Sequence, residues 1–196
     1  MGSEMCIRDR IDIARFPAQL ATINLYRQKI EDFNNFPRIL SHDFFEVTQD
    51  IVFRFPPPRK DNEDSPYIEE TLPQFNAIVG NFPYIRQELI EKRIKGYKKS
   101  LERVLASEWL IDYPDLFELK PKDEKELALS HKNGMDISPF LDKARLLLSG
   151  QADIYAYLFF HAASFLEEGA RMGIITSNSW LDVTSVSYTH LTLPTN

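Results

Sequence analysis

The sequence predicts an α/β protein built on a doubly wound sheet, and three observations lead to this prediction. Short apolar runs of strand type alternate with helical segments along most of the chain. Polar residues follow the ends of the expected strands, where ligands bind in sheets of this kind. The composition, with 43% hydrophobic and 27% charged residues, is typical of a globular domain.

The first half of the chain is expected to hold three strands and one helix. A strand ends within residues 10–13, and a helix follows over residues 16–30, with a proline tolerated in its first turn. A second short strand lies within residues 38–45. Residues 53–67 are rich in proline and charge and are expected to form a loop, which the third strand follows over residues 75–80.

The second half is expected to hold three helices, a polar insertion and a fourth strand. A helix with a basic face covers residues 86–110, and the hydrophobic pattern then weakens, so that an insertion spans about 91–138. Such a basic face contacts phosphates in some proteins, but a solvated surface of mixed charge is the commoner case. The last elements are a short helix over residues 139–148, a long helix over about 153–167 and a strand over 171–176.

Charge and composition exclude several classes of protein. The formal net charge of −6 argues against a protein whose whole surface binds nucleic acid, but it allows a local basic groove. A single cysteine, Cys6, allows neither an internal disulfide nor a cysteine-based zinc site, and the histidines show no metal-binding spacing. The most apolar helical run, residues 155–166, is too short to span a membrane. We therefore expect a cytoplasmic protein without a metal.

The two ends of the chain fit no periodic pattern. Residues 5–10 and 186–196 resemble translated sequencing-adapter read-through, although ordinary polar termini would look similar. We expect residues 1–10 and 184–196 to be non-native segments. The fold would then occupy residues 11–183, as an internal piece of a longer protein.

Four stretches resemble one enzyme family. "FNAIVGNFPYIRQE", residues 75–88, is similar to the catalytic strand and loop of adenine-specific (N6) DNA methyltransferases, whose motif is Asn/Asp-Pro-Pro-Tyr. Residues 152–181 resemble the next helix–strand unit of that family, and residues 11–25 and 39–45 match its second and third sheet strands. The resemblance is to the large type I and type IIG restriction–modification methylases.

The resemblance implies a partial Rossmann-like fold that depends on S-adenosyl-L-methionine, with the first strand and the glycine-rich loop expected before residue 11. It implies methyl transfer to the 6-amino group of an adenine flipped out of double-stranded DNA, in restriction–modification or phage defence. The catalytic residues would be Asn81, Phe82, Pro83 and Tyr84. The cofactor would be bound by Asp12, Asp43 and Phe44. Residues facing the base would be Tyr155, Ser177, Asn178 and Trp180.

The expected chemistry suits these residue types. The 6-amino nitrogen of adenine is a poor nucleophile because its lone pair is delocalised into the ring. The side-chain oxygen of Asn81 and the backbone carbonyl of Phe82 would accept its two hydrogens and localise the lone pair, so positioning and electrostatics carry the rate. Pro83 would stiffen the loop, and Tyr84 would stack on the flipped base.

Several alternatives stay open at this point. Phe82 stands where the family usually has proline, so residues 81–84 could be a simple strand-exit turn. Asp12 could be an acid at a helix N-terminus, Asp43 a turn residue, and Tyr155 part of the core. The same clamp suits a planar amine in RNA or in a protein amide. A catalytically dead nucleic-acid-binding relic of the fold is the remaining possibility.

Overall fold

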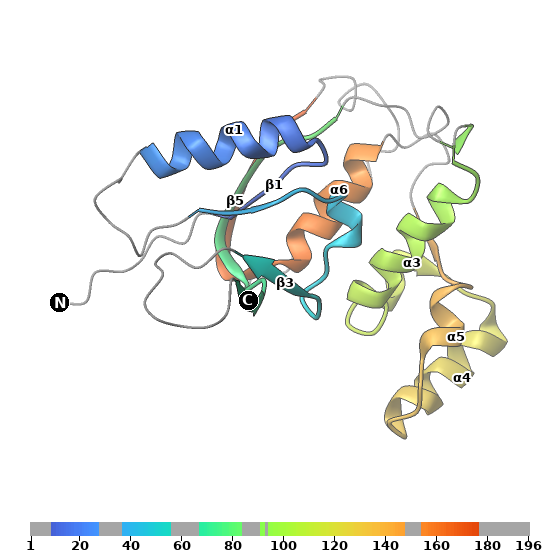
Figure 1. The fold of residues 1–196 in the computed structure, drawn as a ribbon. Coiled ribbons are helices and arrows are strands. Elements are labelled where there is room, and N and C mark those ends of the chain that lie inside the picture. Colours follow the sequence, from blue (N-terminus) through green and yellow to red (C-terminus); the bar gives the residue numbers. More distant parts are fainter. Residues whose placement is uncertain are drawn as a thin grey trace. The chain divides into compact units, whose positions relative to one another are not determined.

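The structure, a computed structural model, is mixed α/β, as the sequence predicts (Figure 1). It describes residues 9–27, 37–55, 67–83, 91–92, 94–147 and 154–176. The chain divides after Gln74 into two compact units. Within the described ranges, no helix has the length and apolar character that crossing a membrane requires.

The first unit opens with a strand, a helix and a parallel strand. β1 (Asp9–Ile11) pairs in parallel with β2 (Arg38–Leu40), and α1 (Arg15–Tyr26) connects them in sequence. The pairing continues past β1, because the backbone N–H of Asp12 donates to the carbonyl of Leu40 at 3.0 Å. This confirms the predicted strand, helix and strand. β1 begins ahead of residue 11, where the sequence places the start of the fold.

The prediction of a loop over residues 53–67 is wrong at its start. β3 (Val52–Phe55) pairs in an antiparallel manner with β4 (Ile68–Thr71). Phe53 and Phe55 alternate with exposed residues and are only 7% and 1% exposed, so β3 follows the period of two that a half-buried strand requires. The three prolines that follow Phe55 conceal this short alternation in the sequence.

The core of the first unit forms where short elements turn their apolar side chains inward. A 3-10 turn, η2 (Phe44–Glu46), follows β2. Burial of these apolar groups stabilises the unit. The buried side chains beyond α1 are Leu40, Phe45, Val47, Phe53, Phe55 and Leu72.

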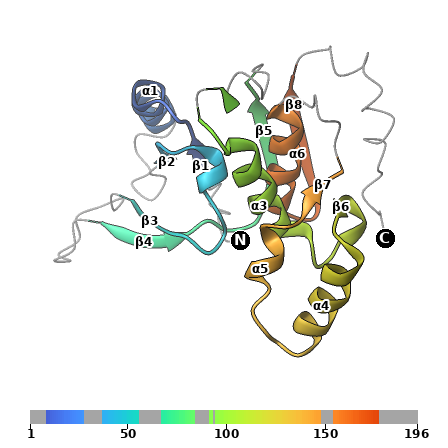
Figure 2. The same ribbon diagram turned by 90° about the vertical axis from the view of Figure 1, so that its right-hand side faces the viewer.

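The second unit is organised around another parallel pair. β5 (Phe75–Asn81) lies beside β8 (Leu166–Ile175) and pairs with it (Figure 2). The register of the pairing places Asn81 opposite Ile175. α6 (Ile154–Ser164) leads into β8 through a single residue, Phe165. The predicted strands over 75–80 and 171–176 are therefore confirmed, although β8 starts earlier than expected.

The predicted long helix over about 153–167 is too long at its C-terminus. α6 ends at Ser164, and the chain enters β8 at Leu166, where the backbone carbonyl of Phe165 accepts a hydrogen bond from Phe75 at 2.7 Å. Gly169 adopts φ of 77° inside β8, a left-handed conformation that glycine adopts readily. The helical pattern of the sequence continues to about residue 167, but pairing of the following residues with β5 ends the helix at Ser164.

The predicted basic helix over residues 86–110 is interrupted at Gly96, and its first residues, 86–90, lie outside the described residues. α3 runs from Tyr97 to Trp109, and Gly96 ahead of it has a left-handed φ of 81°, which a continuous helix does not allow. α3 packs on α6, and its side chains Leu101 and Leu105 are fully buried. Two polar contacts join the same helices: Glu108 with His161, and Trp109 with the backbone of Phe160.

The insertion expected over about 91–138 is more regular than its sequence pattern indicates. α4 (Pro121–Lys132) follows a 3-10 turn, η3 (Pro114–Leu116), and a short strand, β6 (Phe117–Glu118). The predicted helix over 139–148 is wrong beyond its first residues, since α5 (Ser138–Leu141) is short and β7 (Arg145–Leu146) pairs with β6. Proline begins α4 and is tolerated there because its missing N–H would have no partner.

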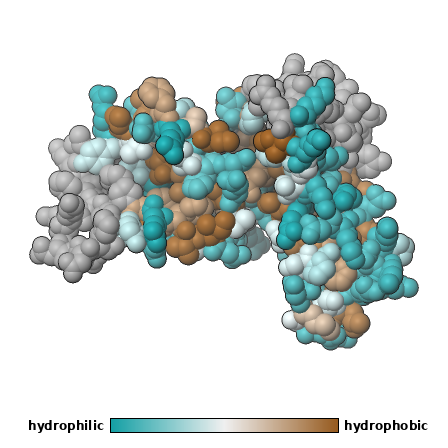
Figure 3. Space-filling view, turned by 45° about the vertical axis from the view of Figure 1, so that its right-hand side comes forward, coloured by the Kyte–Doolittle hydropathy of each residue, from teal (hydrophilic) through white to brown (hydrophobic). Residues whose placement is uncertain are grey.

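Hydrophobic patches lie among hydrophilic residues on the face that Figure 3 shows. In the first unit, α1 exposes an apolar stripe at helical spacing, formed by Phe16, Leu20 and Ile23. In the second unit, one face of the β5–β8 pair exposes Val79 and Ile175, which are 84% and 66% exposed. Parallel strands are usually covered on both faces, so these side chains mark a face that suits further packing.

Candidate functional site

Asn81 is the last residue of β5, at the carboxyl end of a parallel strand pair. Its side chain is exposed and lies on the same face of the sheet as Val79 and Ile175. Ligands of parallel α/β sheets bind beyond this end of the strands. The position of Asn81 therefore suits the acceptor role that the sequence predicts for it.

Phe82 faces the opposite way and belongs to the core. Its side chain is 8% exposed, and its ring meets the ring of Phe159 on α6 edge-on, with 5.5 Å between the centroids and 72° between the planes. Its backbone N–H donates to the carbonyl of Ile175 at 3.2 Å, which carries the β5–β8 pairing one residue beyond Asn81. Phe82 thus fixes the start of the loop by packing and by a hydrogen bond. Pro83, which follows it, is exposed.

Tyr155 lies one helical turn before Phe159 on α6 and is 8% exposed. Residues four apart on a helix share a face, so Tyr155 projects from the side of α6 that meets Phe82. The burial of Tyr155 fits a core position behind the loop, which was one of the two alternatives that its sequence context left open.

Thr176 is a polar residue of this region that the sequence prediction missed. It follows β8 directly, beside the carboxyl end of β5, and its hydroxyl oxygen is buried with no hydrogen-bond partner in the described part of the chain. A buried hydroxyl without a partner costs about 1–3 kcal/mol. Its position after an apolar strand and before Ser177 and Asn178 was the only available signal in the sequence.

Four of the predicted site residues lie outside the described residues. These are Tyr84, Ser177, Asn178 and Trp180.

Asp12 lies at the carboxyl end of β1 in the first unit. Its carboxylate accepts a hydrogen bond from the backbone N–H of Ala14 at 3.0 Å and lies 3.5 Å from the guanidinium of Arg10. Asp12 therefore stabilises the turn that leads into α1. This is the structural role of an acid at a helix N-terminus, which the sequence left open as an alternative. An ionised carboxylate offers about four acceptor positions, so this bond leaves capacity for a ligand.

Asp43 follows β2 and caps the 3-10 turn. Its carboxylate accepts from the backbone N–H of Phe45 at 3.1 Å, and the neighbouring Phe44 is half-buried. Because β1 and β2 are parallel neighbours, their carboxyl ends meet at one edge of the pair. Asp12 and Asp43 thus belong to the same edge, as the sequence predicts, and both also have a structural role there.

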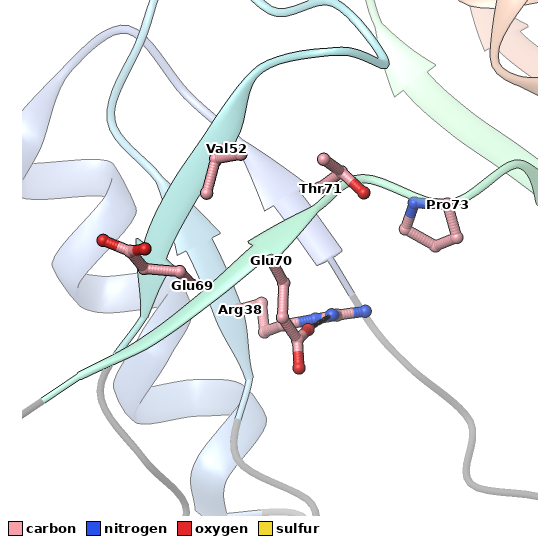
Figure 4. Close-up of a pocket in the computed structure, with 6 residues that line it drawn as sticks. All are labelled: Arg38, Val52, Glu69, Glu70, Thr71 and Pro73. Atoms are coloured by element: carbon pink, nitrogen blue, oxygen red, sulfur yellow. Dashed lines mark hydrogen bonds and ion pairs between the residues drawn. The ribbon is translucent and has the colours of Figure 1, made fainter. Parts of the chain in front are cut away.

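A shallow hollow of about 500 Å³ lies elsewhere in the first unit (Figure 4). Arg38 pairs there with Glu70 and lies 5.7 Å from the ring centre of Phe55, while Glu69 pairs with Arg54 at 3.0 Å. Each carboxylate of the hollow is matched by an arginine: the Arg54–Glu69 pair joins β3 to β4, and the Arg38–Glu70 pair joins β2 to β4. The hollow is lined by Arg38, Val52, Glu69, Glu70, Thr71 and Pro73.

Among the described residues, no three His, Cys, Asp or Glu side chains gather in a way that could hold a metal ion. Comparisons of the chain with protein-family models, with curated proteins and with solved structures found no match.

Proposed function

We propose that this chain forms part of the catalytic domain of a DNA adenine-N6 methyltransferase that uses S-adenosyl-L-methionine. The observation that carries the proposal is the position of Asn81, exposed at the carboxyl end of a parallel strand and directly before a buried anchor residue, Phe82. The resemblance of residues 75–88 to the catalytic loop of these enzymes gives that position its chemical meaning.

Within the mixed α/β class, we propose that the strands belong to a doubly wound sheet. Both strand pairs expected to carry site residues, β1–β2 and β5–β8, are parallel, and helices connect their strands in sequence. The exposed apolar face of β5 and β8, with Val79 and Ile175, favours a sheet that is covered on both faces. These features support a doubly wound arrangement over an antiparallel one.

The residues at the edge of β1 and β2 fit the adenosine part of the cofactor. Asp12 and Asp43 place two carboxylates at one edge, and carboxylates accept hydrogen bonds from hydroxyl and amino groups. In the proposal, Asp12 accepts from the ribose hydroxyls and Asp43 from the adenine amino group, with Phe44 packed behind it. S-adenosyl-L-methionine supplies a methyl group on a sulfonium centre.

Asn81 and Phe82 act on the amine of the substrate. The side-chain oxygen of Asn81 accepts one hydrogen of the flipped adenine's 6-amino group, and the backbone carbonyl of Phe82 accepts the other. These bonds strengthen as positive charge develops on the nitrogen, so they lower the barrier to transfer. Tyr84 provides a ring for the base to stack on, a contact worth about 1–3 kcal/mol.

The experiment compares two asparagines of the same strand in the full-length gene product. Asn81→Ala removes the proposed acceptor and is expected to slow methyl transfer to DNA by about 10²–10³-fold, the scale of losing one preorganised polar contact. Asn76→Ala is the matched control, since Asn76 is exposed on β5 and its side chain bonds Glu167. The control is expected to retain activity within a few-fold.

Radiolabelled methyl incorporation into DNA and calorimetric cofactor binding are the two readouts. Cofactor affinity should be the same in both variants, because Asp12 and Asp43 are intact. Near wild-type transfer by Asn81→Ala would show that residues 81–84 are only a strand-exit turn. Methylation of RNA or of a protein amide in place of DNA would reassign the substrate.

A further inference from the structure

The segment from Glu91 to Lys99 concentrates positive charge on an otherwise acidic chain. Its sequence, EKRIKGYKK, holds five lysine or arginine residues and one glutamate, whereas the whole chain carries a formal net charge of −6. Lys92, Lys95 and Lys99 are exposed, and none of them forms an ion pair with another described residue. By contrast, Lys98 of the same segment lies within ion-pair distance of a carboxylate, as do Lys122 and Lys143 elsewhere in this unit.

Glu91 is the one acid of the segment, and its carboxylate is hydrogen-bonded to backbone N–H groups. Its carboxylate accepts from the N–H of Gly96 at 2.6 Å and from the N–H of Lys98 at 2.9 Å, at the start of α3. The pKa of Glu91 is lowered, first by the hydrogen bond from the backbone of Lys98 and then by that from Gly96. This bonding links Glu91 to the start of α3, with Lys92 and Lys95 between them in the sequence and Lys99 in the first turn of α3.

The segment lies at the same end of the second unit as Asn81. α3 runs parallel to α6, because Glu108 of α3 contacts His161 at 2.6 Å and, earlier on both helices, the charge of Glu102 acts on Tyr157. α6 runs antiparallel to β8, since it leads into that strand and its middle contacts Phe82 at the far end of the pair. The start of α3 therefore lies toward the carboxyl ends of β5 and β8, as both ribbon views show (Figures 1 and 2).

We propose that Lys92, Lys95 and Lys99 form a phosphate-contacting surface that holds duplex DNA at the Asn81 end of the second unit. The inference rests on the proposed function for the choice of DNA as the polyanion. Exposed ammonium groups bind phosphates as point charges, and each neutralised phosphate releases condensed counterions. The surface would position the duplex without reading its sequence.

The test measures how the affinity of this 196-residue chain for a labelled duplex depends on salt. The triple variant Lys92→Gln, Lys95→Gln and Lys99→Gln is compared with wild type by fluorescence anisotropy between about 50 and 200 mM salt. The slope of log affinity against log salt is expected to fall in magnitude by about 1 for each lysine that contacts a phosphate. Unfolding midpoints in urea confirm that the variants are folded.

The matched control changes the same number of exposed lysines at the start of α4, one just before the helix and two within it: Lys120→Gln, Lys122→Gln and Lys125→Gln. The control should keep the wild-type slope. An unchanged slope in the first variant, an equal fall in the control, or no binding by the wild-type chain at the lowest salt would each overturn the proposal.

The dependence of DNA affinity on salt is measured without methyl transfer. The experiment can therefore reject the DNA-binding surface and the methyltransferase activity independently of each other. Asn81→Ala should bind DNA with the wild-type slope even where transfer is lost. A lysine-dependent slope in a protein that methylates no DNA would support the DNA surface and reject the proposed activity.

Discussion

The backbone N–H of Phe82 donates a hydrogen bond to the carbonyl oxygen of Ile175 at 3.2 Å. The methyltransferases that the loop resembles usually carry proline at this position, and proline has no N–H to donate. In this chain the loop start is instead held by strand pairing and by the contact of the Phe82 ring with Phe159. The departure from the family pattern therefore leaves a fixed backbone at the proposed catalytic loop.

Phe82→Pro is expected to destabilise the protein, although it restores the residue usual in the family. It removes the N–H that bonds Ile175 and the aromatic ring that packs on Phe159, and losing a buried phenylalanine side chain alone costs about 3–5 kcal/mol. Phe82→Leu keeps the N–H and most of the apolar contact, so it should cost clearly less. Urea denaturation of both variants measures this, and equal stability of Phe82→Pro and wild type would contradict the anchoring role.

Gly80→Ala is expected to displace the Phe82 ring. A Cβ atom at Gly80 would lie 3.2 Å from the ring of Phe82 and 3.3 Å from the side chain of Ile174, closer than packed atoms normally approach. Such overpacking costs about 1–3 kcal/mol. Gly173→Ala is the matched control on the neighbouring strand, because its new Cβ would meet Val79 at an ordinary 3.7 Å. Similar unfolding midpoints for the two variants would show that Gly80 does not limit this packing.

Glu102 makes stability depend on pH in a defined direction. Its side chain is buried on α3, and burial raises its pKa above 4.5, although Lys98 and Arg145 act in the opposite direction. A carboxyl group whose pKa is higher in the folded state binds more protons when folded, so stability falls as pH rises from 4.5 through the raised pKa. Glu102→Gln cannot ionise and should escape this fall.

The measurement is the urea unfolding free energy of wild type and Glu102→Gln between about pH 4 and pH 8. The advantage of the glutamine variant should grow with pH across the lower part of this range. Glu124→Gln, at an exposed position on α4, controls for the loss of one negative charge. An advantage that shrinks as pH rises would mean that the pairing of Glu102 with Lys98 and Arg145 outweighs its burial.

Some elements could be predicted because their signals lie within a few residues. The apolar run before Asn81 identifies β5, and the run before Thr176 identifies the end of β8. Helical spacing identifies α1, and Asp12 and Asp43 follow their strands as the pattern requires. In each case the alternation or period needed for burial is visible in the local sequence.

Other elements depended on partners far along the chain. β3 was missed because its pairing with β4 decides that Phe53 and Phe55 are buried, whereas the nearby prolines indicate a loop. The end of α6 was misplaced because pairing with β5 draws Leu166 into a strand. The helix predicted over residues 86–110 is interrupted at Gly96, where the carboxylate of Glu91 accepts hydrogen bonds from the backbone, and helical periodicity does not reveal this break.

The sequence by itself determined the α/β class, the order of the main strands and the polar residues that follow them. Only the tertiary structure decided that Asn81 is exposed while Phe82 turns inward, because that choice depends on the ring of Phe159 and the carbonyl of Ile175. It also decided that Lys92, Lys95 and Lys99 lie at the Asn81 end, through the parallel packing of α3 and α6. Local patterns report which side chains favour burial, whereas the surfaces that bury them are assembled from distant segments.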